Sequence, residues 1–540
     1  MFERKISVRS KYLFFPISND EKKYKVFIKE NGETAYDVDL RLSGNPDYIT
    51  WLDVEDKTGR ELGFACEEDV LSLITQGDEL PGDLYQETDR PHYHFTPLRG
   101  WVNDPNGLTY ANGKYHLFYQ HNPYDTRWGN MHWGHSHSDD LFHWIYDGEA
   151  LFPDQDGTMF SGAAVFDGKN VSGLGTDRNP PVLLFYTCAG GDNAVSSGKK
   201  FTVCVAYSTD GKTFRKYGKG PVVQNIVFGN RDPKVVWHEE SRKWIMILFL
   251  QPYEFAFLSS DNLLDWKMES VSEFPTMNEC PDLFPVGQTG KWAVLAGADY
   301  WGHKSVGKYV IGDFDGKTFS VTDGPYPIDF GREFYSLQTF DNDPKGRRVL
   351  IGWRTRNFYL PAANKMPFQG EYSVPTELKP CVIDGKVRLG RYPVEEFFTL
   401  CRETIFTKRE PLVEASKKDA HMIRNLNAGE SFALKLSFKP KNNLMVVVDV
   451  AGAGIVYDSE MQTLQCMDKN VPVPPEEDGT VEMLILRDTQ SIELFAQGGK
   501  YPVSGYIEPH GDEVSLDLYR GDADDFFCEI KAVEGIFKKT

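Results

Sequence analysis

Five short stretches of this sequence open in a similar way, and their recurrence constrains the fold more than any other feature. Each places a turn before an apolar, strand-like run, and they follow one another at intervals of roughly 45–70 residues. An interval of that length accommodates a four-stranded sheet, and sheets repeated in this way are typical of a β-propeller. The five openings are NDPNGLTY (103–110), MFSGAAVF (159–166), RDPKVVW (231–237), ECPDLFP (279–285) and EFYSLQTF (333–340).

These repeats predict a five-bladed β-propeller over residues 89–385, although a β-sandwich with coincidental turns would also produce short strands at such spacing. Before it, KYKVFIKENGETAYDVDLRLS indicates strand–turn–strand with Asn-Gly at the turn. Residues 1–88 are therefore expected to form a small N-terminal β-domain and a linker. After it, residues 386–540 alternate apolar and polar side chains over hairpin lengths, which predicts a C-terminal β-sandwich. Because long helical patterns are scarce, the whole chain is predicted to be all-β.

The formal net charge of −20 argues against nucleic acid or an anionic membrane as a partner, because the phosphates of either would be repelled. No apolar run is long enough for a membrane span, and the N-terminus lacks the apolar core of a signal peptide. The eight cysteines form no Cys-x-x-Cys pair, which disfavours a zinc ribbon and favours a reducing compartment. The expected location is the cytoplasm, or the periplasm or exterior if an export signal has been removed.

Three acids occupy the same place in three of the repeats. Asp104, Asp232 and Glu279 each stand at the start of the first strand, next to a proline or one residue from it. The first strand of every propeller blade lines the central channel, so these acids are expected to converge. Crowded carboxylates raise at least one pKa, and an ionised acid beside a protonated one is the pair used in glycoside hydrolysis. The alternatives are that each acid binds backbone amides at a strand entry, or that the three bind Ca²⁺.

The sequence around these acids resembles the signature motifs of glycoside hydrolase family 32, which includes invertases, inulinases and levanases. The motifs are WVNDPNG (101–107), RDP (231–233) and EC (279–280), and further similarity extends over about 89 to 540. The resemblance implies a propeller followed by a sandwich, and release of terminal β-D-fructofuranosyl residues by a retaining double displacement. It also implies that Asp104 is the nucleophile, Glu279 the general acid and base, and Asp232 a transition-state stabiliser. No cofactor and no metal are expected.

The same motifs imply a fructose pocket around the acids. Arg231, beside Asp232, is expected to lower the pKa of that acid and keep it ionised. Cys280 is expected to pack near Glu279 and not to act as a nucleophile. Trp128 and Trp353 would wall the sugar, with core packing as the alternative for both. The expected substrate-binding residues are Asn103, Gln120, Trp128, Phe160, Ser161, Arg231 and Trp353.

Several positions depart from the family pattern, and these leave the preference for the leaving group open. They are Val102, Glu333, Asn357-Phe358 and Phe368-Gln369. The expected partner is a small-molecule or polymeric fructoside: sucrose, a fructo-oligosaccharide, inulin or levan. An endo-acting levanase or inulinase, or a fructosyltransferase, remains the nearest alternative, and a non-catalytic fructan-binding propeller is an alternative of another class. A homodimer is possible.

Overall fold

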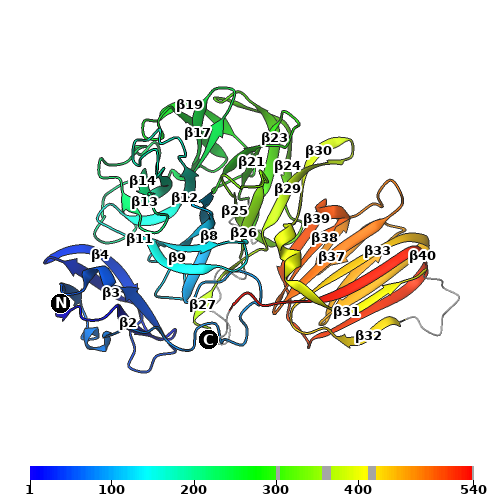
Figure 1. Cartoon of the computed structure of the whole chain (residues 1–540), viewed down its shortest axis with the longest axis horizontal. Helices are drawn as coiled ribbons and strands as arrows, with labels where there is room; N and C mark the ends of the chain where they lie inside the picture. The colour runs from blue at the N-terminus through cyan, green and yellow to red at the C-terminus, as the bar shows by residue number, and fades with distance from the viewer. Residues whose placement is uncertain (299–304, 356–365, 412–420, 538–540) are drawn as a thin grey trace.

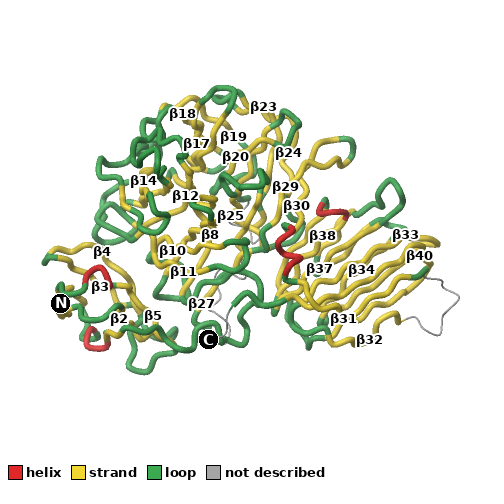
Figure 2. Tube along the Cα trace, in the orientation of Figure 1, coloured by secondary structure: helices red, strands yellow, loops and turns green. Residues whose placement is uncertain are grey.

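The structure is a computed structural model, and it describes residues 1–298, 305–355, 366–411 and 421–537 (Figure 1). Strands make up almost all of its regular structure (Figure 2). The prediction of an all-β chain is confirmed. The helical elements in the described ranges are short 3-10 turns, namely η1 (Glu55–Lys57), η2 (Leu71–Leu73), η5 (Glu395–Thr399) and η7 (Gln497–Gly499).

The central part of the chain forms five antiparallel four-stranded blades. The first two are β8 (Gly100–Ala111), β9 (Lys114–Asn122), β10 (His132–Ser138), β11 (Ile145–Leu151), and β12 (Thr158–Phe166), β13 (Val182–Ala189), β14 (Thr202–Ser208), β15 (Arg215–Lys216). The next two are β16 (Arg231–His238), β17 (Lys243–Gln251), β18 (Glu254–Ser260), β19 (Lys267–Glu273), and β20 (Asp282–Pro285), β21 (Trp292–Ala296), β23 (Lys308–Phe314), β24 (Phe319–Pro327). The fifth is β25 (Glu333–Thr339), β26 (Val349–Arg354), β29 (Thr376–Ile383), β30 (Lys386–Pro393).

The blades close into a ring. Their innermost strands, β8, β12, β16, β20 and β25, contact one another in that order, and β25 also contacts β8. A short strand, β27 (Phe368–Gln369), pairs in parallel with the start of β8 and ties the end of the propeller to its beginning. Two further short strands, β22 (Ser305–Val306) and β28 (Glu371–Tyr372), add to β25 and β26. The predicted five-bladed propeller is therefore confirmed.

Apolar side chains of the propeller gather between neighbouring blades. Leu183 and Phe185 of the second blade, for example, belong to one buried cluster with Met246 and Leu248 of the third. Burying this surface removes it from water, which is the main favourable contribution to folding. Because the blades bury their faces against each other, polar side chains at the start of the innermost strands are left to line the axis.

The N-terminal domain consists of two small sheets, one of order β1-β6-β3-β4 and one of order β5-β2-β7, around a common apolar core. Figure 1 shows it beside the first blade of the propeller. Its strands are β1 (Phe2–Ser7), β2 (Tyr12–Ile17), β3 (Tyr24–Glu30), β4 (Glu33–Leu40), β5 (Tyr48–Asp53), β6 (Glu61–Cys66) and β7 (Thr75–Gly77).

The C-terminal β-sandwich is built on two long strands, β33 (Phe432–Val450) and β40 (Glu513–Val533), which pair along most of their length. The first part of β33 also pairs with β37, and its last part with β34, so it takes part in both layers. The remaining strands are β31 (Cys401–Arg409), β32 (His421–Asn427), β34 (Ala453–Asp458), β35 (Thr463–Cys466), β36 (Lys469–Pro472), β37 (Val481–Asp488), β38 (Ser491–Ala496) and β39 (Tyr501–Tyr506).

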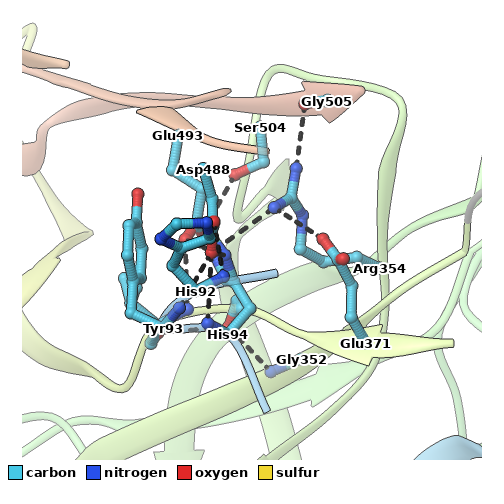
Figure 3. A network of polar contacts seen from close by, with 12 residues as sticks. His92, Tyr93, His94, Gly352, Arg354, Glu371, Asp488, Glu493, Ser504 and Gly505 are labelled. Carbon is cyan, nitrogen blue, oxygen red and sulfur yellow. Dashed lines mark hydrogen bonds and ion pairs between the residues drawn. The ribbon is translucent and has the colours of Figure 1, made fainter. Parts of the chain in front are cut away.

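A buried ionic network joins the propeller to the sandwich (Figure 3). The Nδ1 of His94 lies 2.8 Å from Asp488 and its Nε2 lies 2.9 Å from Glu493, and all three side chains are almost fully buried. Arg354, at the end of β26, donates to the carbonyl of Gly505 at 2.8 Å. Burial opposes a charge on His94, but its hydrogen bonds to the two carboxylates outweigh burial and raise its pKa to about 9. A charged imidazole therefore links the two domains at neutral pH.

Candidate active site

The three acids lie where the innermost strands of three blades begin. Asp104 is on β8, Asp232 is on β16, and Glu279 stands shortly before β20. The pairing of β8 and of β16 with the next strand is interrupted at Asp104 and at Asp232. Asp232 has a φ of 61° and Cys280, next to Glu279, a φ of 56°. Interruptions of this kind re-aim a side chain, and each left-handed non-glycine residue costs about 1–3 kcal/mol that the surrounding fold must offset.

The three acids line one cavity of about 240 Å³. The structure brings together around it every residue that the sequence predicts for the site, and it adds two more, Tyr335 and Ser336. The lining residues are Asn103, Asp104, Gln120, Trp128, Phe160, Ser161, Arg231, Asp232, Glu279, Tyr335, Ser336 and Trp353.

A thiol and a guanidinium connect the three carboxyl groups. The Sγ of Cys280 lies 3.3 Å from Oδ2 of Asp104 and 3.5 Å from Oδ2 of Asp232. Burial and the nearby carboxylates raise the pKa of Cys280, so the group is a neutral thiol and not a nucleophilic thiolate, as predicted. The Nη2 of Arg231 lies 3.1 Å from Oε2 of Glu279, and its Nε lies 3.7 Å from Oδ2 of Asp232. The acids therefore form one cluster.

Arg231 acts on Asp232 in the predicted direction, since it lowers the pKa of that acid, but burial has the larger effect. The side chain of Asp232 is only 3% exposed. Burial raises its pKa, Arg231 opposes that effect, and the charges of Glu279 and Asp104 add to it, with a net pKa of about 7. Arg231 makes its closer contacts with Glu279. Asp232 can therefore carry a proton near neutral pH, as carboxylate crowding predicts.

The other two acids are more accessible. Asp104 is partly exposed and Glu279 is 22% exposed, and both face the cavity. Ser161, on the innermost strand of the second blade, donates a hydrogen bond to Oδ2 of Asp104 at 2.5 Å. This bond holds one carboxylate oxygen, so the orientation of Asp104 is set by a neighbouring blade.

Aromatic rings form much of the cavity wall. Trp128 lies on the loop between β9 and β10, is 41% exposed, and meets Phe160 edge to face at 5.9 Å. Trp353 is almost fully buried and packs edge to face on Trp101 at 5.8 Å, so it both lines the cavity and belongs to the core. The Nε2 of Gln120 donates to the carbonyl of Met159. Flat rings with a few oriented polar groups are the usual composition of a small-molecule pocket.

Two lining residues were not predicted from the sequence. The hydroxyl of Tyr335 donates to Oε1 of Glu279 at 3.3 Å, and Ser336 contacts the thiol of Cys280 at 3.5 Å. Ser336 also has a left-handed φ of 47°, like Asp232 and Cys280. The signal that could have found this pair is their position, because they open the fifth repeat as the acids open the first, third and fourth.

The departures from the family pattern lie in different places. Asn357 and Phe358 fall outside the described residues. Phe368 is buried, and Arg90 stacks on its ring at 3.8 Å.

Among the residues that the structure describes, no group of three or more His, Cys, Asp or Glu side chains is arranged to hold a metal.

Comparison with known proteins places this geometry in a family. The model of the Glycosyl hydrolases family 32 N-terminal domain matches residues 94–389. The chain belongs to glycosyl hydrolase family 32. A levanase of Bacillus subtilis is 32% identical over 493 residues, which cover 83% of this chain and 71% of the levanase. An extracellular exo-inulinase of Aspergillus awamori is 31% identical over 502 residues, which cover 80% of this chain and 92% of the relative.

The solved structure of exo-inulinase from Aspergillus awamori superimposes with a TM-score of 0.73 at 28% identity, over 84% of this chain and all of that one. As a member of family 32 the protein is a glycosidase. Within the described residues no helix is long and apolar enough to cross a membrane. The cytoplasmic location and the homodimer stay predictions.

Proposed function

We propose that the protein is a retaining β-fructosidase that releases terminal β-D-fructofuranosyl residues from fructans, fructo-oligosaccharides or sucrose. The observation that carries this proposal is the cluster of Asp104, Asp232 and Glu279 around one cavity, connected by Cys280 and Arg231. The family members described above, a levanase and an exo-inulinase, support a fructan as the substrate.

In the first step, Asp104 attacks the anomeric carbon while the bond from that carbon to the leaving oxygen breaks. Glu279 gives its proton to the leaving oxygen, and the product is a fructosyl ester on Asp104. The anomeric carbon of fructose is tertiary, so positive charge develops there readily, and the negative charge of Asp104 stabilises it, together with that of Asp232 when Asp232 is ionised. Ser161 orients Asp104 through its 2.5 Å hydrogen bond.

In the second step, Glu279 accepts a proton from water, whose oxygen attacks the anomeric carbon, and the ester bond breaks to free Asp104. Asp232 does not react. With a pKa of about 7 it can accept or donate a hydrogen bond, which suits a group that binds hydroxyls of the sugar ring. If a sugar hydroxyl takes the place of water, the same site transfers fructose.

Product analysis with sucrose, kestose, inulin and levan tests the substrate and the mode of action. Fructose as the first and main product supports the proposal, and a ladder of oligosaccharides would replace it by endo cleavage. Products longer than the substrate would indicate transfer. NMR of the first-released sugar checks the mechanism, since two displacements retain the β configuration and one inverts it.

Two variants test the assigned roles. Asp104→Asn should lower kcat by at least about 10⁴-fold, because no ester can form. Glu279→Gln should lower kcat on sucrose by about 10²–10⁴-fold, and azide should restore turnover of a fructoside with an activated leaving group. The matched control is Asp261→Asn, which removes an exposed carboxylate on the outside of the third blade and should change nothing. Full activity of Asp104→Asn would reject the mechanism.

A further inference from the structure

The N-terminal domain packs on the loop that carries Trp128. This loop, residues 123–131, connects β9 to β10 in the first blade and will be called the Trp128 loop. The family match begins only at residue 94, so the N-terminal domain lies outside it. Nothing in the proposed mechanism requires that domain, yet it lies beside the first blade in Figure 1.

An ion pair fixes the loop before Trp128. The Nε of Arg41, in the N-terminal domain, lies 2.8 Å from Oδ2 of Asp125, and the two side chains are 15% and 2% exposed. The Oδ1 of Asp125 accepts the backbone N–H of Arg127 at 3.2 Å. A charged hydrogen bond shielded from water holds its partners more firmly than one at the surface. The direction in which the chain enters Trp128 is therefore set from outside the propeller.

Further hydrogen bonds add to this anchor. The hydroxyl of Thr126 donates to the side-chain oxygen of Asn19 at 3.1 Å, and Arg127 donates to the carbonyl of Asn19 at the same distance. Tyr124, in the loop, belongs to the apolar core of the N-terminal domain and meets Phe15 edge to face at 5.4 Å. The first half of the loop is thus part of the domain interface.

A second anchor fixes the loop after Trp128. The side chain of Asn130 imitates a backbone pair with Asp39 of the N-terminal domain, accepting from its N–H at 2.7 Å and donating to its carbonyl at 2.8 Å. Gly129 and Asn130 have left-handed φ values of 147° and 46°. Glycine and asparagine adopt such φ values readily, and contacts with the N-terminal domain hold the loop on both sides of Trp128.

We propose that the N-terminal domain is a working part of the active site: by clamping the Trp128 loop at Asp125 and Asn130, it sets where Trp128 stands at the mouth of the cavity. This inference rests on the proposed function, because it assigns the domain to fructoside binding. Trp128 lines the cavity and is 41% exposed, so its ring reaches from the cavity to solvent, where the rest of a fructoside beyond its terminal sugar would contact it. The domain therefore acts on affinity for the substrate more than on the chemical step.

The test removes the clamp without touching the cavity. Arg41→Met deletes the guanidinium and keeps an apolar stem, and Thr126→Val deletes one hydrogen bond at the same interface with little change of shape. Lys57→Met is the matched control, because it breaks an ion pair with Glu30 inside the same domain, away from the loop. We expect the two clamp variants to raise KM for kestose by about tenfold with little loss of kcat, and Lys57→Met to raise neither.

A double-mutant cycle separates the clamp from general damage to the fold. In a Trp128→Ala background, Arg41→Met and Thr126→Val should have almost no further effect on KM, since the ring that they position is gone. Equal effects in both backgrounds, or unchanged KM in both clamp variants, would overturn the inference. Amide hydrogen exchange of the Trp128 loop should also become faster in the clamp variants and not in Lys57→Met.

The exchange measurement keeps the inference separate from the proposed function. If the unmodified protein cleaves no fructoside, the proposed function fails, and the role in substrate affinity fails with it. Unchanged exchange of residues 123–131 in both clamp variants would reject the clamp itself, whatever the enzyme cleaves.

Discussion

Asp232→Asn should make the protein more stable while it removes most of the activity. The carboxyl of Asp232 has a pKa of about 7 in the folded protein, against about 3.9 in an unfolded chain. The difference of about three pKa units corresponds to about 4 kcal/mol lost on folding when the group is ionised in both states. An asparagine avoids this loss and can still accept the N–H of Cys280, which Asp232 now accepts at 3.1 Å.

The gain should depend on pH. Because folding raises the pKa of Asp232, the unsubstituted protein loses stability as the pH rises from about 4 to about 7, and the loss is complete above pH 8. At pH 8 we expect Asp232→Asn to stabilise the propeller by about 2–4 kcal/mol, since relaxation of the site recovers part of the loss, and to raise Tm by about 3–6 °C. At pH 5 the gain should fall to about 1 kcal/mol. Differential scanning calorimetry at the two pH values measures both.

A buried acid in the next blade is the matched control. Asp282 is fully buried on β20, but it lies 3.1 Å from Lys234 and accepts the N–H of Thr339 at 2.6 Å. Asp282→Asn leaves that lysine buried without its counter-charge, so it should cost about 3–5 kcal/mol. If Asp232→Asn lowers Tm at pH 8 as Asp282→Asn does, or if its gain is the same at pH 5, the account of the raised pKa is refuted.

Two further substitutions follow from the contacts. Tyr335→Phe removes the hydroxyl that donates to Glu279 and should lower kcat/KM for sucrose by about tenfold while shifting the pH profile, whereas an unchanged profile would show that the tyrosine only packs. His94→Gln should flatten the dependence of Tm on pH between about 6.5 and 9, because the raised pKa of His94 gives stability that is complete below 6.5 and lost as the pH rises through 9. Parallel Tm curves for the two proteins over that range would contradict this.

Much of the fold could be predicted because its signals are local. The Asn-Gly hairpin expected near the N-terminus is present: β3 and β4 pair antiparallel, and Asn31 and Gly32 have φ values of 53° and 85°, as the turn requires. The blade openings could be recognised because every innermost strand lines the same central channel, so the sequence at the start of each strand follows a similar pattern. The way the N-terminal domain rests on the Trp128 loop could not be predicted, since it depends on pairs such as Arg41 and Asp125 that are far apart in the sequence.

The site, like the fold, has some residues that could be predicted from the sequence and others that could not. Acids at equivalent repeat positions were found because a carboxylate at a strand entry is conspicuous, whereas Tyr335 at the same position is an ordinary strand residue. The sequence shows that Arg231 is next to Asp232, but it does not show how deeply Asp232 is buried. Burial by several blades decides that pKa, and the guanidinium lies closer to Glu279.

The contact of β25 with β8 has a consequence for how the protein matures. Asp104, Asp232 and Glu279 come from the first, third and fourth blades, and Tyr335 and Trp353, which also line the cavity, come from the fifth. The cavity is therefore complete only when the fifth blade has closed the ring. Full activity is therefore expected only after the ring has closed. Recovery of turnover after dilution from denaturant should therefore report closure of the ring. It should be slower than the spectroscopic signals that report formation of the individual sheets.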